Sequence, residues 1–305
     1  MRSKIAGVVL VLVSALSFAL ATTIAKFAVQ AGASVPHVTW LRFASGFIVA
    51  STLVMKDRSK LKANQPFWIA ARAISNTMVV FLLFYSVQFT TVSKANILNL
   101  TYPVFVFLFA PLVTKEKITR LQLLSLATTL VGVVFVVRPF RAEVTGGLQL
   151  GDMLAIGSAL AAGFAIAALR RARRHDDTTT ILFYLMAVGL TFNTFLLLGT
   201  PLPESSALGI AATAGAFGAI GQFAFTGALR TITAPTGAVI STARILFATV
   251  LGVWFFADPI DAFLVFGAIL VMGSIAIVSL QRGNNEVPDS EVKVQSVPTE
   301  PVGPA

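Results

Sequence analysis

The sequence predicts an all-α polytopic membrane protein with ten transmembrane helices, arranged as two inverted five-helix repeats. Of the 305 residues, 56% are hydrophobic and 12% are charged, whereas soluble domains carry about a quarter charged residues. The apolar residues form long runs separated by short polar segments, and the second half of the chain repeats features of the first. This composition disfavours a water-soluble enzyme and a nucleic-acid-binding domain.

Ten apolar segments are long enough to cross the hydrocarbon core, which needs about 20 residues per helix. In order, helices are expected over residues 5–27, 37–55, 67–88, 95–113, 120–138, 150–170, 180–199, 206–229, 236–256 and 260–280. The segments between them are short and rich in Lys, Arg, Pro, Asp and Gly, so no soluble domain is inserted. The first segment is too long for a signal peptide, and no clear cleavage site follows it, so it is expected to be retained.

The distribution of Lys and Arg predicts the orientation. With the N-terminus in the cytoplasm, sixteen of the 23 basic residues fall on the cytoplasmic side, and two, Arg138 and Arg141, fall on the opposite side. This positive-inside pattern places both termini in the cytoplasm. The formal net charge of +10 therefore follows from topology, and nucleic acid is not an expected partner. The remaining basic residues lie inside or at the ends of apolar segments and are Lys26, Arg42, Arg72, Lys94 and Arg244.

The internal repeat has a period close to half the chain. The stretch GVVLVLVSAL in the first half matches GDMLAIGSAL in the second half at an offset of 144, which aligns Ser14 with Ser158. Because each half contains an odd number of helices, the halves must lie in opposite orientations. Inverted repeats are typical of secondary transporters, whose halves rock around a central site. We expect repeats over 1–140 and 141–282, followed by a polar, Pro-rich, disordered cytoplasmic tail over 283–305.

Two longer stretches resemble the drug/metabolite transporter superfamily in its ten-helix, EamA-type branch. They are YSVQFTTVSKANILNLTYPVFVFLFAPLVTKEKIT and FAFTGALRTITAPTGAVISTARILFATVLGVWFFADPI. The sequence departs from the family pattern at Lys115, where a Gly usually precedes the acidic residue, and at Ala243, near the place of the second-half proline. The resemblance implies a carrier of the bacterial inner membrane, more often an exporter of metabolites or toxic compounds than an importer.

Interior basic residues are the first candidates for solute binding, since an ionisable residue in hydrocarbon costs about 2.5–3.5 kcal/mol on insertion scales. Arg244 lies about eight residues, or roughly 12 Å, into its helix and so close to the membrane midplane. Arg72 and Arg42 lie less deep and face either a cavity or the lipid headgroups. Lys26 and Lys94 lie near the outer interface, where a snorkelling amine is the alternative interpretation.

Polar and aromatic side chains at helical spacing extend this set. Asn76 is four residues from Arg72, and Asn99 shares a helix face with Pro103, with Tyr102 one step round. Pro103 lacks an N–H and is expected to kink its helix. An alternative role for Asn99 is to join neighbouring helices. The complete predicted substrate-binding set is Arg244, Arg72, Asn76, Asn99, Tyr102, Arg42, Trp40, Gln222, Lys26 and Lys94.

Three residues are predicted to have structural or gating roles. They are Pro103, Glu116 and Asp258, of which the two acids align at an offset of 142 and fall on opposite sides of the membrane. In the eighth helix, Gly215 and the glycines three and six residues later are expected to allow close helix packing.

The absence of acidic residues from the membrane interior points to the class of solute. All 13 acids fall in loops, helix ends or the C-terminal tail, so neither a polycationic drug nor a proton relay has a buried carboxylate. Guanidinium groups bind carboxylate and phosphate in a bidentate manner. The sequence therefore predicts alternating-access transport of a small anionic or zwitterionic metabolite, or of an amphiphilic drug-like compound.

Other functions are weighed against this one. A flippase of an anionic lipid-linked headgroup would also use interior arginines, and an importer or exchanger has the same fold as an exporter. A channel or scaffold does not need inverted halves. An enzyme is not expected, because HExxH, GxSxG and a buried acid pair are lacking. With no Cys and two His, no metal or other cofactor is expected. The partners are a small-molecule solute and the lipid bilayer, and a homodimer is compatible with the sequence.

Overall fold

The computed structural model describes residues 2–86, 89, 95, 98–137, 150–256 and 262–280. These residues form helices and connecting turns, with no strand among them. The elements are α1 (Arg2–Gln30), α2 (Val35–Lys56), η1 (Arg58–Leu61), α3 (Pro66–Ser86), α5 (Tyr102–Thr114), α6 (Arg120–Val137), α7 (Leu150–Ala172), α8 (Thr178–Leu197), α9 (Ser205–Ala228), α10 (Ala234–Ser241), α11 (Ala243–Phe256) and α12 (Ala262–Leu280). Lys94, Asp258 and the predicted tail over 283–305 lie outside the described residues.

The predicted membrane spans are confirmed. Among the described residues, eight spans are long and apolar enough to cross a membrane, and α10 and α11 together form one of them. With the two shorter apolar helices, α5 and α6, the described residues give the ten spans that the sequence predicts. A helix of this composition is stable in lipid because its backbone groups are satisfied within the helix.

Two of the predicted helices are broken, which corrects the expectation of continuous segments over 95–113 and 236–256. The first has a turn at Leu100 and Thr101, just before α5. Pro103 lies in the first turn of α5, where its missing N–H costs nothing. The second is broken at Thr242, whose hydroxyl donates to the Val239 carbonyl over 2.5 Å. Such a bond competes with the regular helix ladder.

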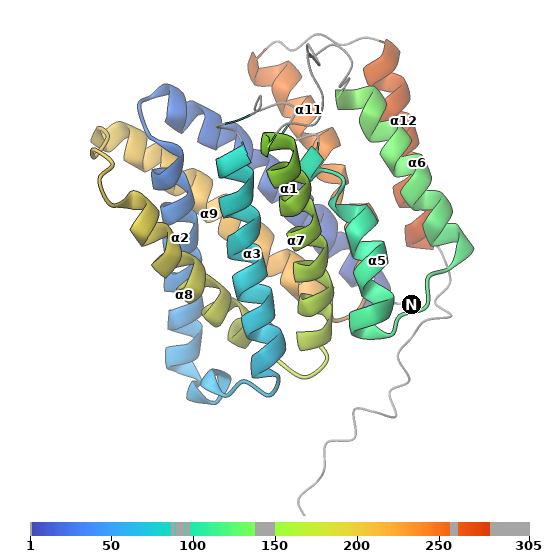
Figure 1. The fold of residues 1–305 in the computed structure, drawn as a ribbon, viewed down its shortest axis with the longest axis horizontal. Coiled ribbons are helices and arrows are strands. Elements are labelled where there is room, and N and C mark those ends of the chain that lie inside the picture. Colours follow the sequence, from blue (N-terminus) through green and yellow to red (C-terminus); the bar gives the residue numbers. More distant parts are fainter. Residues whose placement is uncertain are drawn as a thin grey trace, which may run out of the picture.

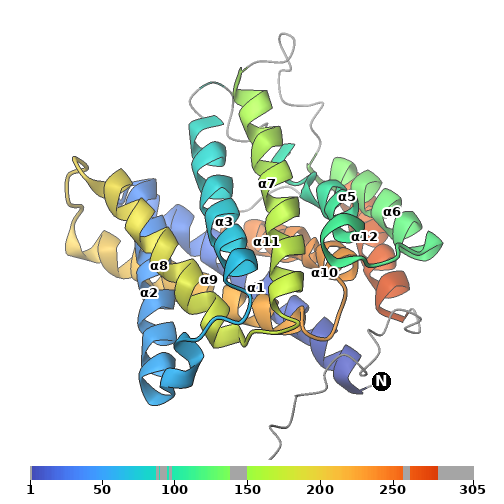
Figure 2. The same cartoon turned by 60° about the horizontal axis from the view of Figure 1, so that its bottom comes forward.

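The helices of the first half pack mainly against helices of the second half. The most extensive pairings include α1 with α9, α3 with α7, α2 with α8, and α6 with α12. Figure 1 shows α6 and α12 side by side at one edge of the molecule, and Figure 2 shows α3 alongside α7. Exchanging the two halves turns α1/α9 into α7/α3 and maps α2/α8 and α6/α12 onto themselves. The packing therefore has the pseudo-two-fold symmetry of inverted repeats.

The contact between α2 and α8 shows this symmetry at the level of single residues. A Cβ atom on Gly46 would lie 2.6 Å from the Met186 sulfur, and one on Gly189 would lie 2.2 Å from Cε1 of Phe43. Gly46 aligns with Gly189, and Phe43 with Met186, both at an offset of 143. Each half therefore supplies one glycine and one large side chain to the same contact.

The serines of the aligned decapeptides make equivalent hydrogen bonds. Ser14 of α1 donates to the carbonyl of Gly221 in α9 over 2.7 Å. Ser158 of α7 donates to the carbonyl of Val79 in α3 over 2.8 Å. The sequence match between the halves thus corresponds to a shared structural role, which is to tie the first helix of each half to the third helix of the other.

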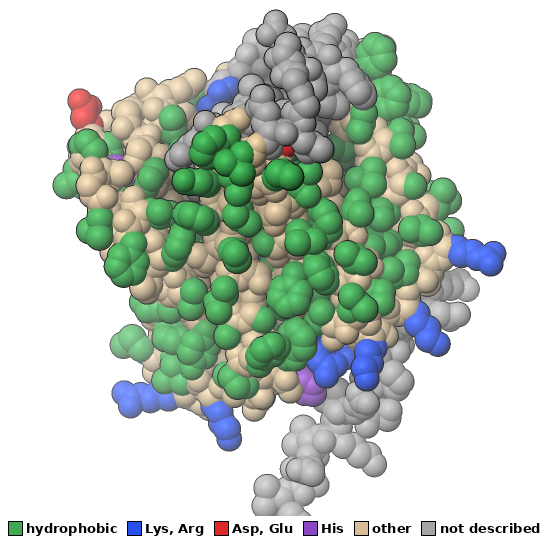
Figure 3. All heavy atoms as spheres, viewed as in Figure 1, with side chains coloured by type: hydrophobic (Ala, Val, Ile, Leu, Met, Phe, Trp, Pro, Cys, Tyr) green, Lys and Arg blue, Asp and Glu red, His purple; other side chains and the backbone are tan. Residues whose placement is uncertain are grey.

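The surface has the character of a membrane protein. In Figure 3 hydrophobic side chains cover most of the visible face, and Lys and Arg side chains gather along its lower rim. The chain segments at that end are 56–65, 115–120, 170–177 and 229–233, which connect α2–α3, α5–α6, α7–α8 and α9–α10. We call this end of the molecule the basic end.

Candidate functional site

Three interior arginines from different helices form a cluster of positive charge. Arg42 lies in α2, Arg72 in α3 and Arg244 in α11. Arg72 is buried, whereas Arg42 and Arg244 are half-buried. Arg42 lies within electrostatic reach of both of the others and repels them. We call these three residues the arginine cluster.

The partners of Arg42 are uncharged. Its guanidinium carbon lies 5.1 Å from the centre of the Phe18 ring, a cation–π arrangement. Its aliphatic stem crosses α9, where a Cβ atom on Gly218 would lie 3.0 Å from Cγ of Arg42. In the described part of the chain, no member of the arginine cluster forms an ion pair with a carboxylate. The positive charge of the cluster is therefore not neutralised by those residues.

Two buried hydrogen-bond donors in this region are unsatisfied. Nε of Arg72 and Nε2 of Gln222 find no hydrogen-bond partner among the described residues, and each side chain is 4% exposed. Gln222 follows Gly218 by one helical turn, so it lies on the face of α9 that Arg42 crosses. Leaving a buried donor unpaired costs about 1–3 kcal/mol. A ligand that accepts hydrogen bonds would remove this cost.

The three arginines have no counterparts in the other repeat. At the offsets given by the packing, Arg42 aligns with Leu185 and Arg72 with Ala214. Arg244 is the second residue of α11, as Pro103 is the second residue of α5. By structure, therefore, Arg244 rather than Ala243 takes the place of the first-half proline. The scaffold is duplicated, but the interior charge is not.

Three other predicted site residues join helices. Asn99 donates from Nδ2 to the Ser158 hydroxyl over 2.8 Å, which matches the helix-joining alternative. The hydroxyls of Tyr102 and Ser241 share a hydrogen bond of 2.6 Å, so the two helix breaks touch. Trp40 donates from Nε1 to the Thr194 hydroxyl over 3.0 Å. Solute contact by these side chains stays a prediction.

The last two described candidates differ in their surroundings. Asn76 is half-buried on α3, one turn from Arg72, which places it on the side of the arginine cluster. Lys26 is exposed near the end of α1 that lies away from the basic end. Of the two, only Asn76 is placed to act with the cluster.

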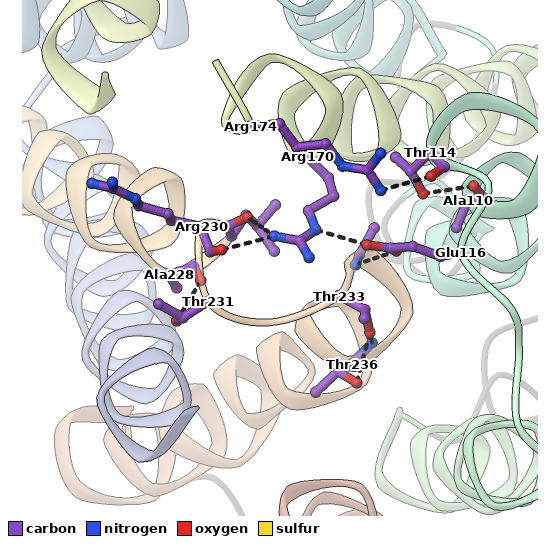
Figure 4. Close-up of polar contacts among 12 residues, drawn as sticks. Ala110, Thr114, Glu116, Arg170, Arg174, Ala228, Arg230, Thr231, Thr233 and Thr236 are labelled. Atoms are coloured by element: carbon purple, nitrogen blue, oxygen red, sulfur yellow. Dashed lines mark hydrogen bonds and ion pairs between the residues drawn. The ribbon is translucent and has the colours of Figure 1, made fainter. Parts of the chain in front are cut away.

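A second polar site lies at the basic end, where Glu116 and Arg170 form a buried ion pair (Figure 4). Nε of Arg170 donates to Oε1 of Glu116 over 2.7 Å. Nη1 of Arg170 donates to the carbonyls of Leu229 and Arg230 over 2.6 and 3.0 Å. The other carboxylate oxygen of Glu116 accepts from the backbone N–H of Ala234 over 3.1 Å. One ion pair therefore connects α5, α7 and the α9–α10 turn.

The helix ends explain why this ion pair tolerates burial. Arg170 binds the free carbonyls that follow α9, and Glu116 binds the free N–H that begins α10. A cation at a helix C-terminus and an anion at a helix N-terminus are both favoured by the helix dipole. Removing one member of a buried pair costs about 3–5 kcal/mol, because the other charge is left without compensation.

Further arginines of the α7–α8 connection complete a network at this end. Arg174 donates from Nη2 to the Thr114 carbonyl over 2.7 Å. Arg173 donates to the carbonyls of Thr226 and Asp176. Burial lowers the pKa of Arg173 to about 10, and the nearby Arg230 acts in the same direction, so the side chain stays charged at neutral pH. The carboxylate of Asp176 accepts from the backbone N–H groups of residues 64 and 65 over 2.6 and 2.9 Å.

We call Glu116, Arg170, Arg173, Arg174 and Asp176 the basic-end network. Sequence reasoning identified Glu116 as a gating candidate but assigned the arginines to membrane topology alone. For Arg173 a local signal exists in the sequence RRARRHDD, in which two acids follow the basic run, whereas the partners of Arg170 and Arg174 lie far away in the chain. Charges that only set topology have no need of adjacent partners.

Comparison with known proteins identifies the family. The EamA-like transporter family matches residues 5–138 and 149–280, once for each half. The pseudopaline exporter CntI of Pseudomonas aeruginosa is 25% identical over 284 residues, which cover 90% of this chain and 96% of that protein. An uncharacterized transporter of Clostridium kluyveri is 25% identical over 300 residues, which cover 92% and 96%.

Human solute carrier family 35 member G1 is 28% identical over 223 residues, which cover 69% of this chain and 61% of that protein. The chain thus spans about three fifths of this relative. A crystal structure superposes with a TM-score of 0.74 at 20% identity, covering 92% of this chain and 96% of the other, which shows a shared fold. Two family matches, one for each half of a symmetrically packed helical membrane protein, lead to one conclusion: the chain belongs to the EamA-like transporter family.

Proposed function

We propose that the protein is a secondary transporter that exports a small anionic or zwitterionic metabolite, which binds at the arginine cluster. The observation that carries the proposal is the group of three interior guanidiniums without carboxylate partners among the described residues. The unsatisfied donors of Arg72 and Gln222 support it. Export is supported by the relative that is named as an exporter. We place the protein in the bacterial inner membrane with both termini in the cytoplasm, on the positive-inside rule.

The chemistry of arginine suits this role. A guanidinium does not lose its proton in a protein, and its planar group of donors matches a carboxylate or phosphate. In a membrane interior the attraction between such a cation and an anion is stronger than in water, since the dielectric constant is low. A solute anion would satisfy the charges that the protein leaves uncompensated.

Alternating access gives the basic-end network its role as a gate. Glu116 belongs to the first half, whereas Arg170 and the α9–α10 turn belong to the second half. Rocking one half against the other would pull the members of this ion pair apart. In the proposal, the conformation described above is closed at the basic end, and entry of solute from that side requires the network to open.

Counterflow in proteoliposomes tests the proposed function. Vesicles that hold an unlabelled organic anion are diluted into labelled anion, and accumulation of label above equilibrium is expected from a carrier. The Arg244→Ala variant should lose this accumulation, whereas Arg58→Ala, which removes an exposed arginine of η1, should retain it. Unchanged counterflow of every transported solute in Arg244→Ala would contradict the proposed site.

A further inference from the structure

We infer that the solute of the arginine cluster carries at least two negative charges, as a dicarboxylate or a phosphate does, and that a monoanion or zwitterion is a poor ligand. This inference rests on the proposed function and narrows its solute class. It concerns the number of charges on the ligand, which the family and its named relatives leave open.

The arginine cluster carries three positive charges. Arg42, Arg72 and Arg244 are permanently charged, and Arg42 repels both of the others. No carboxylate of the described residues pairs with any of them. A single negative charge would leave two of these three cations uncompensated in a membrane interior. Two or three negative charges on one ligand would attract several guanidiniums at once and so offset the repulsion between them.

The hydrogen-bond donors of the cluster come from different helices. The three guanidiniums come from α2, α3 and α11, so they approach from separate helices rather than from one face. Arg42 repels each of the other two, and its guanidinium carbon lies 5.1 Å from the centre of the Phe18 ring on α1. A ligand with two separated anionic groups can bind two guanidiniums at once, each in the bidentate manner that the fork of donors favours.

A positively charged group on the ligand would be disfavoured in this cluster. A zwitterion would bring an ammonium group toward cations, and an ammonium needs an anionic or aromatic partner. The Phe18 ring already has Arg42 as its cationic partner, with the guanidinium carbon 5.1 Å from the ring centre. The buried amide nitrogen of Gln222 is a donor and also suits an anion. The two buried side-chain atoms that lack a hydrogen-bond partner in this region, Nε of Arg72 and Nε2 of Gln222, are therefore both donors.

The inference is tested by ligand-induced thermal stabilisation of the purified full-length protein. Succinate, butyrate and 4-aminobutyrate form a matched series with the same four-carbon backbone and with two, one and no net negative charges. Citrate, glycerol phosphate and vesicles of phosphatidate extend the series to a trianion, a free phosphate monoester and a lipid phosphate monoester. Ionic strength is held constant with potassium chloride, so that general screening does not differ between samples.

The expected result is a rise in Tm with the multiply charged probes and a midpoint concentration at least about tenfold lower than for butyrate and 4-aminobutyrate, as the loss of one charged hydrogen bond implies. Equal or tighter binding of the monoanion or the zwitterion overturns the inference. So does a panel in which no multiply charged probe raises Tm. A response limited to the lipid vesicles would overturn the free-solute reading in favour of a lipid headgroup.

Charge variants link the result to the cluster. Arg72→Gln should weaken binding of the stabilising dianion about ten- to a hundredfold, and Arg72→Lys should recover part of the loss because it keeps the charge. Arg58→Gln is the matched control outside the cluster. If Arg72→Gln does not fold, Arg42→Gln serves the same purpose. Unchanged dianion binding in the variant that folds overturns the inference.

Counterflow distinguishes failure of the charge assignment from failure of the proposed transport function. Accumulation of a labelled monoanion or zwitterion, with no response to dianions, would leave the transporter in place and remove the charge assignment. Stabilisation by dianions without counterflow of any solute would retain the charge assignment and remove the proposed function.

Discussion

At the scale of single residues, the buried arginines of the two sites differ in how their charge is compensated. Arg170 has a carboxylate at 2.7 Å and two backbone carbonyls as partners. Arg72 is buried to a similar degree, yet its Nε has no partner among the described residues. A buried charge with partners can join neighbouring helices, whereas a buried charge without partners lowers the stability of the ligand-free protein. This difference supports the proposal that Arg72 binds the solute.

This contrast predicts opposite effects on stability and function at position 72. Arg72→Met keeps a long side chain in α3 but removes the uncompensated charge, so the ligand-free protein should become more stable by about 1 kcal/mol or more. Thermal unfolding should show this as a rise of about 2–4 °C in Tm, and counterflow should be lost. A lower Tm with intact counterflow would assign Arg72 to the scaffold.

The opposite prediction applies to Glu116. Glu116→Gln leaves Arg170 without its anion and should weaken the closed basic end by about 3–5 kcal/mol. The chain contains no Cys, so a single Thr236→Cys change gives one thiol to label. Thr236 lies in α10 and is 5% exposed. A membrane-impermeant maleimide applied at the basic end should label it at least about tenfold faster in the Glu116→Gln background.

Arg120→Gln is the matched control for this labelling experiment, because Arg120 is exposed at the start of α6. It should leave the labelling rate of Cys at position 236 unchanged. Equal rates in Glu116→Gln and in the parent protein would mean that the ion pair does not hold the basic end closed.

At the scale of elements, the predicted and observed helices agree in length because the thickness of the bilayer sets that length. The thickness of the hydrocarbon core sets helix length, and the predicted segment 150–170 differs from α7 by only two residues at its C-terminal end. The breaks before α5 and after α10 were not predicted as such. They depend on tertiary contacts such as the Tyr102–Ser241 hydrogen bond, which apolar periodicity does not encode.

The same distinction applies to the candidate site. The arginines could be found from the sequence because a charge inside an apolar run is visible by itself. The roles of Asn99 and Arg170 could not, since both depend on partners 59 and 54 residues away. A contact over such a distance leaves no local pattern.

Packing of α9 against α2 predicts a graded series of glycine variants. A Cβ atom on Gly215 would lie 2.9 Å from the backbone nitrogen of Arg42, and backbone cannot yield cheaply, so Gly215→Ala should cost about 1–3 kcal/mol. A Cβ atom on Gly218 would meet Cγ of the Arg42 side chain at 3.0 Å. That side chain can move, so Gly218→Ala should lower Tm less than Gly215→Ala does. Because the change displaces Arg42, it should also weaken solute binding.

Gly209 is the internal control for this series, because a Cβ atom there would have no neighbour within 4 Å. Gly209→Ala should stabilise α9 by about 0.5–1 kcal/mol through helix propensity. Unfolding temperatures of the three variants, measured side by side with anion binding, check the series. A loss of stability that ranks Gly218→Ala above Gly215→Ala would contradict the described approach of α2.

At the scale of the whole molecule, the close contact between α6 and α12 is made by residues that are not members of the basic-end network. The two helices are the last of their repeats and approach so closely that a Cβ atom on Gly132 would lie 2.9 Å from the Gly267 carbonyl oxygen. The hydroxyls of Thr129 and Ser274 meet there at 2.6 Å. Backbone packed at this distance has little freedom to slide, so this pair is expected to stay together while the basic end opens.

A disulfide between these two helices provides the test. Thr129→Cys and Ser274→Cys, introduced together, should oxidise readily, since the two parent oxygen atoms already touch. Counterflow of the oxidised protein should remain within about twofold of the reduced protein, as expected for a contact between rigidly packed backbones. Loss of counterflow on oxidation, restored by reduction, would show that α6 and α12 separate during transport.

The pairing of every major helix of the first half with a helix of the second half also has a consequence for the order of events during synthesis. The chain is synthesised from the N-terminus at about 5–20 residues per second, so α1 waits roughly 10–40 seconds for α9, and α6 waits roughly 7–30 seconds for α12. During that interval the Ser14 hydroxyl lacks the Gly221 carbonyl, and the Thr129 hydroxyl lacks Ser274. The first half is therefore an intermediate that is inserted in the membrane before its hydrogen-bond partners in the second half are made. A chain that stops between the halves should be degraded rather than accumulate.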